Sequence, residues 1–258
     1  MEITALVIST TRSRAPLLRY AISSVINQSR KPNELIVVMS YDDREIRELV
    51  DPYGFVIYHV STRVGPMWAR GIKESGGDII AFLDDDDEWL QNKLNHVEEV
   101  FSKITGLGLY HNLFQFIDTN GNELYCNDLP AYYCSMLLNR RAIIKNSIDL
   151  YMRSKVDDWL HANYWSLFYN TSSLSAIRDA LISRLDFIES INLYSDAIFF
   201  ILVLSQCYVI VHEPIILTRY RIHGGQTSRK ILNGELMDMA IKDHELFNRI
   251  IREYNTCK

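Results

Sequence analysis

The sequence predicts an α/β fold built on a mostly parallel sheet with helices on both faces. Through the first hundred residues, short apolar runs alternate with segments whose apolar residues recur at helical spacing. Uniformly apolar runs are typical of strands buried on both faces, and parallel neighbours require a helical crossover between them. The chain has 258 residues, 48% of them hydrophobic, which is enough to form a large core.

Four strand–helix units are expected before residue 105. The strands fall at residues 3–8, 35–38, 55–58 and 79–83, and the helices at 16–26, 43–50, 65–75 and 88–104. Pro16 suits the first turn of a helix, and Gly76-Gly77 suits a helix end. The fourth helix is expected to begin at Asp87 and Glu88, because acidic residues are favourable at a helix N-terminus.

The pattern changes after residue 105. Residues 107–125 predict a β-hairpin that turns at Asn120-Gly121. The aromatic stretch from about 130 to 165 suits ordinary packing, which is favoured, or a wall that stacks on an acceptor sugar. An apolar helix is expected at 197–204 and a strand at 208–211.

The tail from Gly234 to Tyr254 predicts an amphipathic helix in which acidic residues, Asp243 among them, outnumber basic ones. That charge balance argues against a cationic membrane anchor and favours packing on the domain or in a homodimer. No Pro/Gly/Ser-rich linker divides the sequence. We therefore expect one domain over residues 1–258, with halves at 1–105 and 106–230 and a C-terminal helix at 231–258.

Composition narrows the function classes. The net charge is −5 and no basic tract is present, so a nucleic-acid partner is not expected. The four cysteines lack metal-binding spacing and are expected to be reduced packing groups. The N-terminus lacks a signal-peptide pattern, and the longest apolar run is too short to span a bilayer. These features predict a cytoplasmic protein that is at most peripherally attached to the membrane.

Asp84 to Asp87 stand directly after the apolar run at residues 79–83. Four adjacent carboxylates repel one another, and a hard divalent cation such as Mg²⁺ or Mn²⁺ would compensate them. At least one aspartate is also expected to cap the following helix. An EF-hand is excluded, because its sixth and twelfth positions, counted from Asp84, hold Trp89 and Asn95.

Polar residues follow the other predicted strands as well: Ser9 to Arg12, Ser40 to Asp43, and His59. Ligands bind beyond the carboxyl ends of strands in open parallel sheets, so these residues mark a nucleotide site. The Gly-rich phosphate loops of dinucleotide-binding and P-loop proteins are absent from the sequence. A nucleotide bound here would need a metal ion for its phosphates.

Four blocks in this order resemble family 2 glycosyltransferases of the GT-A fold. They are Ser9-Thr10-Thr11-Arg12 with residues 17–28, Gly65 to Arg70 leading to Asp84–Trp89, Asn170 to Ser173 with Ser195-Asp196, and Glu213-Pro214 with Tyr220 to Gly225. The resemblance implies transfer of a sugar from a UDP-, GDP- or dTDP-linked donor to a hydroxyl of a glycan or lipid-linked acceptor, with inversion. It also implies a Mn²⁺ or Mg²⁺ cofactor, and it predicts the GT-A arrangement of a nucleotide-binding sheet with an acceptor-side subregion.

The resemblance also assigns site residues. Asp196 matches the general base, and Asp86 and His223 match metal-binding positions. The residues expected to bind the nucleotide sugar are Thr10, Thr11, Arg12, Ser40, Asp42, Arg70, Asp84, Asp85 and Arg221.

The sequence departs from the family pattern in places that concern the donor. Met39-Ser40 stand where an acid usually reads the base, and Asp42 or Asp43 is a shifted substitute. Two other functions are alternatives. One is a sugar nucleotidyltransferase, which would require a Gly-rich loop after the first strand, and the other is a non-catalytic nucleotide-sugar-binding module. The absence of glycine from residues 9–14 disfavours the first of these.

Overall fold

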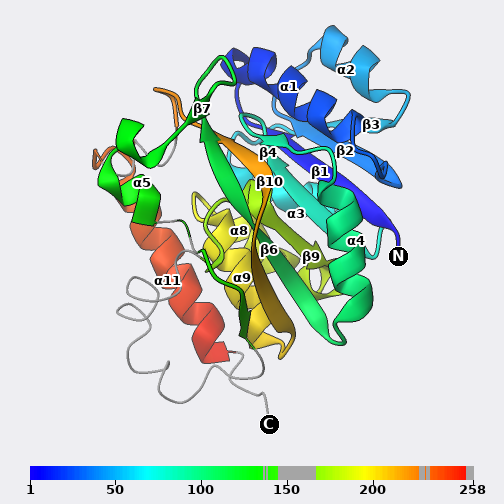
Figure 1. Cartoon of the computed structure of the whole chain (residues 1–258). Coiled ribbons are helices and arrows are strands. Elements are labelled where there is room, and N and C mark those ends of the chain that lie inside the picture. Colours follow the sequence, from blue (N-terminus) through cyan, green and yellow to red (C-terminus); the bar gives the residue numbers. More distant parts are fainter. Residues whose placement is uncertain (136, 138, 145–166, 227–229, 231–232, 254–258) are drawn as a thin grey trace.

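The computed structural model describes residues 1–135, 137, 139–144, 167–226, 230 and 233–253. A mixed sheet of ten strands forms its centre, with the strand order β3-β2-β1-β4-β9-β6-β10-β5 (Figure 1). Strand β7 pairs with β6, and β8 pairs with β10. The strands are β1 (Ile3–Ser9), β2 (Glu34–Met39), β3 (Gly54–Tyr58), β4 (Ile79–Asp84), β5 (Glu88–Trp89), β6 (Leu107–Ile117), β7 (Glu123–Leu124), β8 (Ala142–Ile144), β9 (Leu174–Ile177) and β10 (Val209–Arg221).

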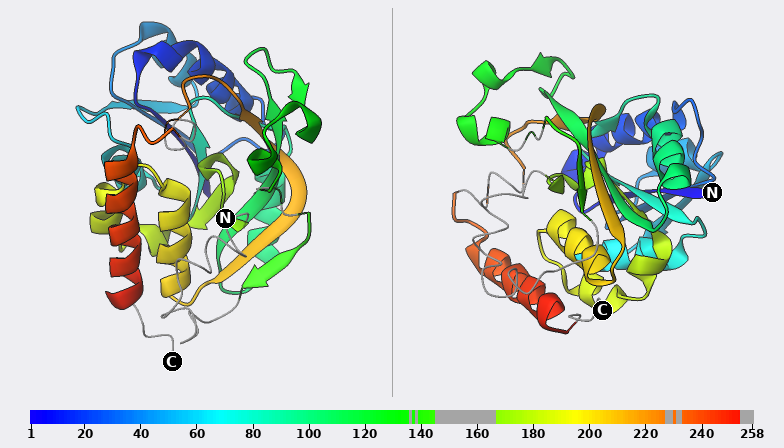
Figure 2. Two further views of the ribbon diagram at one scale, coloured as in Figure 1. Left: turned by 90° about the vertical axis from the view of Figure 1, so that its left-hand side faces the viewer. Right: turned by 60° about the horizontal axis from the view of Figure 1, so that its bottom comes forward.

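Helices cover both faces of this sheet, as the sequence predicts (Figure 2). The α-helices are α1 (Ala15–Ile26), α2 (Arg44–Val50), α3 (Val64–Glu74), α4 (Lys93–Lys103), α5 (Ala131–Ser135), α7 (Arg178–Ile182), α8 (Leu185–Ser190), α9 (Ser195–Ser205) and α11 (Met237–Glu253). Short 3-10 helices lie at η1 (Arg12–Arg14), η2 (Cys126–Asp128) and η5 (Thr171–Ser173).

The first four strands form the predicted parallel half of the sheet. Strand β1 lies between β2 and β4, and β3 lies outside β2. Ser9 is level with Met39, and Ile8 is level with Asp84. The carboxyl ends of these strands therefore meet at one edge, which is where a ligand binds in open sheets of this kind.

Each strand of this half contributes to two cores because successive side chains point to opposite faces. In β1, Leu6 and Ile8 pack with α3, α8 and α9, whereas Ala5 and Val7 pack with α1 and α4. Both cores consist of almost fully buried aliphatic and aromatic side chains. The rigid sheet therefore fixes the edge that carries the aspartates.

The second half joins the sheet in mixed directions. Strand β9 is antiparallel to both β4 and β6, and β10 is parallel to β6. The predicted hairpin is confirmed, since β7 pairs antiparallel with β6. Strand β10 is longer than expected and continues through Pro214 to Arg221, with register shifts between Glu213 and Thr218. This length carries the end of β10 to the aspartates.

The expected start of the fourth helix is wrong. Glu88 and Trp89 form β5, which pairs antiparallel with β10, and α4 begins only at Lys93. The N-cap residue of α4 is Asn92, and it makes no side-chain capping bond. None of the four aspartates therefore caps this helix, and their charge needs another explanation.

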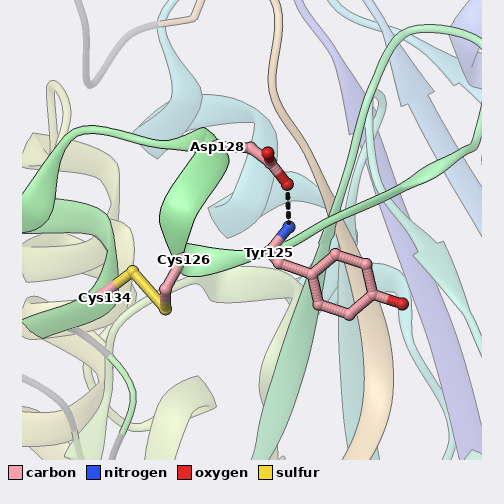
Figure 3. The surroundings of a disulfide bond; sticks show 4 residues. All are labelled: Tyr125, Cys126, Asp128 and Cys134. Atoms are coloured by element: carbon pink, nitrogen blue, oxygen red, sulfur yellow. Dashed lines mark hydrogen bonds between the residues drawn. A yellow bond between two sulfur atoms is a disulfide. The ribbon is translucent and has the colours of Figure 1, made fainter.

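The expectation of reduced cysteines is also wrong. Cys126 and Cys134 form a disulfide that links η2 to α5 (Figure 3). Cys207 is disulfide-bonded too. The cysteines therefore no longer support a cytoplasmic location, because disulfides are rare in reducing compartments. Within the part of the chain that the structure describes, no helix has the length and hydrophobicity needed to span a bilayer.

The aromatic stretch is described only in part. Tyr133 is buried and packs edge-on against Phe116, which matches the favoured packing interpretation for this residue. Trp159, Tyr164 and Trp165 lie outside the described residues, so the alternative of an acceptor-facing wall is not tested there.

Candidate active site

A cavity of 660 Å³ opens at the carboxyl ends of β1 and β4. Asp84, Asp85 and Asp86 line one part of it, and the loop after β1 supplies Thr10, Thr11 and Arg14. Residues from distant parts of the chain complete the wall: Thr171, Asn192, Ser195, Tyr220, His223 and Lys230. The volume is in the range of small-molecule sites, and the lining is polar where the aspartates lie.

Arg14 is the cation that faces the aspartate run. Its Nη1 atom lies 3.0 Å from Oδ1 of Asp85 and 3.2 Å from Oδ2 of Asp86. Although burial lowers the pKa of Arg14, the charges of Asp86 and Asp85 raise it above its ordinary value. The hydroxyl of Ser9 donates a further bond of 2.6 Å to Asp85. Asp85 is thus held by the protein on both of its oxygens.

The pKa of Asp86 is shifted in the opposite direction from the pKa values of Asp84 and Asp85. Burial, followed by the charges of Asp86 and Asp87, raises the pKa of Asp84 well above its ordinary value. Burial and the charge of Asp86 raise the pKa of Asp85 to about 6. Burial also raises that of Asp86, but the bond to His223 and the charge of Arg14 outweigh it and lower the pKa. Negative charge is therefore concentrated on Asp86.

Asp87 and Arg221 make hydrogen bonds that stabilise the loop that carries the aspartate run. The backbone N–H of Arg221 donates to Asp87 at 2.9 Å, and its Nε donates to the carbonyl of Asp86 at 2.9 Å. The Arg221 guanidinium also pairs with Glu88 and reaches the carbonyls of Asp118 and Thr119. Arg221 is 1% exposed, so these bonds brace the loop from beneath.

The loop is tied to a second segment, Asn170 to Ser173. The backbone N–H of Asp84 donates to the hydroxyl of Ser172 at 3.0 Å. The carbonyl of Ser172 accepts bonds from Trp89 Nε1 at 2.9 Å and Lys93 Nζ at 2.8 Å. Burial lowers the pKa of Lys93 well below its ordinary value. This segment therefore has a fixed position relative to the aspartates.

The same segment holds Asp196. The backbone N–H of Asn170 donates to Oδ2 of Asp196 at 3.0 Å, and that of Ala197 donates to Oδ1 at 2.8 Å. Asn170 has a φ of 77°, a left-handed conformation that asparagine tolerates better than most residues. Asp196 is half-buried in the first turn of α9, and burial raises its pKa to about 6. Its neighbour Ser195 lines the cavity.

The residues predicted to bind metal lie together. His223 Nε2 is 2.9 Å from Oδ2 of Asp86, and both residues line the cavity with Asp84. Within the described ranges, no group of three or more His, Cys, Asp or Glu side chains is arranged to hold a metal ion. Mg²⁺ commonly uses one or two carboxylates together with phosphate oxygens of its substrate. Asp86, His223 and a donor diphosphate fit that pattern.

The family is shown by comparison of the whole sequence. A family model described as "Glycosyl transferase family 2" matches residues 6–174, which is well over half of the chain. The chain belongs to glycosyl transferase family 2. The matched residues include the end of β1, the aspartate run and the segment that holds Asp196.

Curated relatives in glycosyl transferase family 2 match part of the chain. An uncharacterized glycosyltransferase of Rickettsia bellii (strain RML369-C) is 35% identical over 109 residues, which cover 40% of this chain and 16% of that protein. An uncharacterized glycosyltransferase of Nostoc sp. is 28% identical over 125 residues, which cover 46% of this chain and 38% of that protein. The matched segments thus span well under half the length of these relatives.

Solved structures share the fold. The crystal structure of S. aureus TarS 1-349 matches with a TM-score of 0.61 at 12% identity, over 94% of this chain and 65% of that chain. TarS 1-349 in complex with UDP-GlcNAc matches with a TM-score of 0.61 at 12% identity, over 99% of this chain and 74% of that chain. The predicted GT-A-like fold with a mostly parallel central sheet is confirmed.

The structure brings together most of the predicted site residues. Thr10, Thr11, Asp84, Asp85, Asp86 and His223 all line the cavity, and Asp196 lies next to cavity-lining Ser195. Arg221 lies behind the aspartate loop, where it braces the loop.

Four of the predicted nucleotide-binding residues lie outside the cavity lining: Arg12, Ser40, Asp42 and Arg70. The Ser40 hydroxyl donates to the carbonyl of Thr10 at 2.8 Å and so supports the loop after β1. Arg70 is exposed on α3 and pairs with Glu74. Asp42 accepts a bond from Tyr58, and Asp43, its alternative as a base reader, caps α2. The residue that reads the base is therefore not assigned.

Sequence reasoning missed Arg14 and Ser172. Arg14 stands two residues beyond the block that carries the resemblance, and a basic residue so close to a strand end was the available signal. Ser172 lies within one of the four blocks, but nothing in the sequence indicates that its hydroxyl reaches Asp84.

Proposed function

We propose that this chain transfers a sugar from a nucleoside-diphosphate sugar to an acceptor hydroxyl by a single inverting displacement. The observation that carries the proposal is the position of Asp196. Two backbone N–H groups orient its carboxylate, and its neighbour Ser195 lines the same cavity as Asp84, Asp85 and Asp86. An inverting displacement requires such a carboxylate on the acceptor side to receive the hydroxyl proton.

In the proposed step, the acceptor oxygen bonds to the anomeric carbon while the bond from that carbon to the phosphate oxygen breaks. The hydroxyl proton passes to Asp196, and the nucleoside diphosphate leaves with the electron pair. Arg14 faces the region where the leaving phosphates would carry their charge. A divalent ion held by Asp86 and His223 would neutralise part of the same charge when bound.

We assign the donor to the half of the site formed by residues 1–105 and the acceptor to that formed by residues 106–230. Thr10, Thr11 and Asp84 would contact the nucleotide, since they lie at the carboxyl ends of β1 and β4. The acceptor would approach Asp196 along the wall that contains Asn192 and Ser195. A glycan or lipid-linked acceptor suits this function, and peripheral attachment to a membrane would give access to a lipid-linked one.

A donor screen tests this function. Thermal shifts with UDP-, GDP- and dTDP-linked sugars in the presence of Mn²⁺ identify the donor, starting with UDP sugars because TarS was crystallised with UDP-GlcNAc. Donor turnover is then compared between the wild type, Asp86→Ala and Asp196→Ala, with Mn²⁺ or Mg²⁺ and with EDTA. Loss of turnover in both variants supports the assignments, and unchanged turnover in both contradicts them. Donor binding without any product across a broad acceptor panel would favour a non-catalytic module instead.

A further inference from the structure

Helix α11 carries a buried acid that sequence analysis places among surface charges. Asp243 is 1% exposed, although its neighbours on the helix include the exposed residues Met237, Asp238 and Ile241. A buried carboxylate is costly unless it is fully hydrogen-bonded. The bonds that Asp243 makes therefore show what the helix holds in place.

Among the described residues, the hydrogen-bond partners of the Asp243 carboxylate all lie in one loop, residues 192–194. Oδ1 accepts from the backbone N–H of Asn192 at 2.8 Å and from its side-chain amide at 2.7 Å. Oδ2 accepts from the backbone N–H of Leu193 at 2.6 Å and from that of Tyr194 at 2.9 Å. One side chain thus fixes three consecutive residues through both of its oxygens.

This loop leads directly into the first turn of α9. Asn192, Leu193 and Ser195 line the cavity, and Asp196 follows at once. Helix α11 lies beside α9 (Figures 1 and 2). Leu236, just before this helix, and Met239 within it also line the cavity. The helix is therefore part of the wall of the candidate active site.

We propose that Asp243 is a positioning residue for the general base Asp196, acting through the loop at residues 192–194. The inference rests on the proposed function, in which Asp196 accepts the acceptor proton. By holding residues 192–194, Asp243 fixes the orientation of the first turn of α9 and thus of the Asp196 side chain. Its negative charge also raises the pKa of Asp196. The indole N–H of Trp68 donates to Ser195 at 3.1 Å and holds the same turn from the other side.

The charge of Asp243 should change the pKa of Asp196, which a purely structural role would leave unchanged. The charge of Asp243 is one cause of the raised pKa of Asp196, after burial and opposed by the backbone bonds from Ala197 and Asn170. The pKa of Tyr194 is raised by burial and by the charges of both Asp196 and Asp243. Removal of the Asp243 charge should therefore lower the pKa of Asp196.

The test is the pH profile of kcat for Asp243→Asn at saturating donor and acceptor. Asparagine keeps one acceptor oxygen but turns an amide toward the N–H groups of Leu193 and Tyr194, so the loop loses its orientation. We expect kcat to fall about 10- to 100-fold and the donor KM to stay within about twofold. The acidic limb of the profile should move to lower pH.

Two controls separate positioning from stability and from general charge. Ile250→Ala removes a fully buried side chain from the same helix, so it should lower Tm while leaving the acidic limb in place. Asp238→Asn removes an exposed acid of α11 and should leave both Tm and the profile unchanged. If Asp243→Asn behaves like Ile250→Ala, with an unmoved limb, the positioning role is wrong.

Hydrogen exchange of the wild-type protein tests the same contact without any variant. The amides of Leu193 and Tyr194 should be protected as strongly as those within α9, because Asp243 accepts from both. Exchange at the rate of an unstructured loop would overturn the proposal even if Asp243→Asn fails to fold. Loss of activity in Asp196→Asn together with either negative result would refute this inference alone and leave the proposed function standing.

Discussion

Asp84 and Ser172 are joined by a hydrogen bond of 3.0 Å from the backbone N–H of Asp84 to the Ser172 hydroxyl. Two residues before Ser172, the N–H of Asn170 donates to Asp196. One short segment thus contacts the first aspartate of the donor side and the candidate base. This segment therefore helps to fix the positions of Asp84 and Asp196 relative to each other.

Replacement of Ser172 by alanine should disturb both sides of the site. The N–H of Asp84 would lose its partner, and a buried unpaired donor costs about 1–3 kcal/mol. We expect a lower Tm and a fall of roughly tenfold in kcat/KM for the donor. Ser175→Ala is the matched control, since the Ser175 hydroxyl is buried and has no hydrogen-bond partner among the described residues. Equal effects of the two substitutions would show that Ser172 has no special role.

Arg14→Met should weaken donor use more than it weakens folding. Methionine retains much of the side-chain volume but removes the cation that faces Asp85 and Asp86. Because the leaving diphosphate would then meet uncompensated carboxylates, we expect kcat/KM for the donor to fall about 10- to 100-fold. Steady-state kinetics measure this. Arg19→Met, at an exposed position on α1, should leave kcat/KM within twofold, and a similar value for Arg14→Met would contradict the assignment.

The activity should depend on an ionisation near pH 6. Asp196 must be deprotonated to accept a proton, and its pKa is raised to about 6. The kcat should therefore rise as the pH increases through about 6 and level off above about 7. Profiles of kcat between pH 5 and 8 measure this. Asp196→Asn should lose about 10²- to 10⁴-fold in kcat, and any residual activity should lack that limb.

The same pKa has a consequence for stability. Asp196 has a pKa of about 6 in the folded protein and close to 4 in the unfolded chain, so between these values the folded state holds a proton that the unfolded state has released. The free energy of unfolding should thus fall as the pH rises through this window and stay constant above it. Relative to Asp196→Asn, the wild type should lose about 1–3 kcal/mol between pH 4 and pH 7. Urea melts at several pH values test this, and a difference independent of pH would contradict the raised pKa.

Metal use should depend on His223. If His223 and Asp86 share the ion, His223→Ala should raise the Mn²⁺ concentration needed for half-maximal turnover about tenfold or more. Titration of the EDTA-treated protein with Mn²⁺ measures this value. His96→Ala is a suitable control, because His96 pairs with Glu213 and does not line the cavity. An unchanged Mn²⁺ requirement in His223→Ala would exclude His223 as a ligand.

The parallel half of the fold could be predicted from the sequence because local sequence patterns determine its strands. Each of the first four strands is an apolar run bounded by turn residues, and the observed bounds differ from the prediction by at most one residue at either end. The start of α4 could not be predicted from such local patterns. Glu88 looks like the first residue of a helix, but Arg219 and Arg221 pair with it from β10. A partner more than 130 residues away outweighs the local preference.

The candidate site likewise contains residues that the sequence singles out and residues that only their long-range contacts identify. The aspartates stand out by type and spacing, and the family resemblance singles out His223; all but Asp87 of these residues line the cavity, whereas the sequence does not single out Arg14 and Asp243. Asp243 looks like one more acid on an amphipathic tail, and only its contact with residues 192–194 distinguishes it. The opposite error concerns Arg70, which suits a phosphate by type but pairs with Glu74 on the surface.

Helix α11 also limits when the protein can become functional during synthesis. The loop after β1 emerges from the ribosome early, but Asp243 lies more than 200 residues later in the sequence. Contacts so distant along the chain form late, because a long loop must close first. A nascent chain that already has strands β1 to β4 would still lack the hydrogen bonds from Asp243 to residues 192–194. Premature termination before α11 should therefore yield a product that can bind the donor without using it.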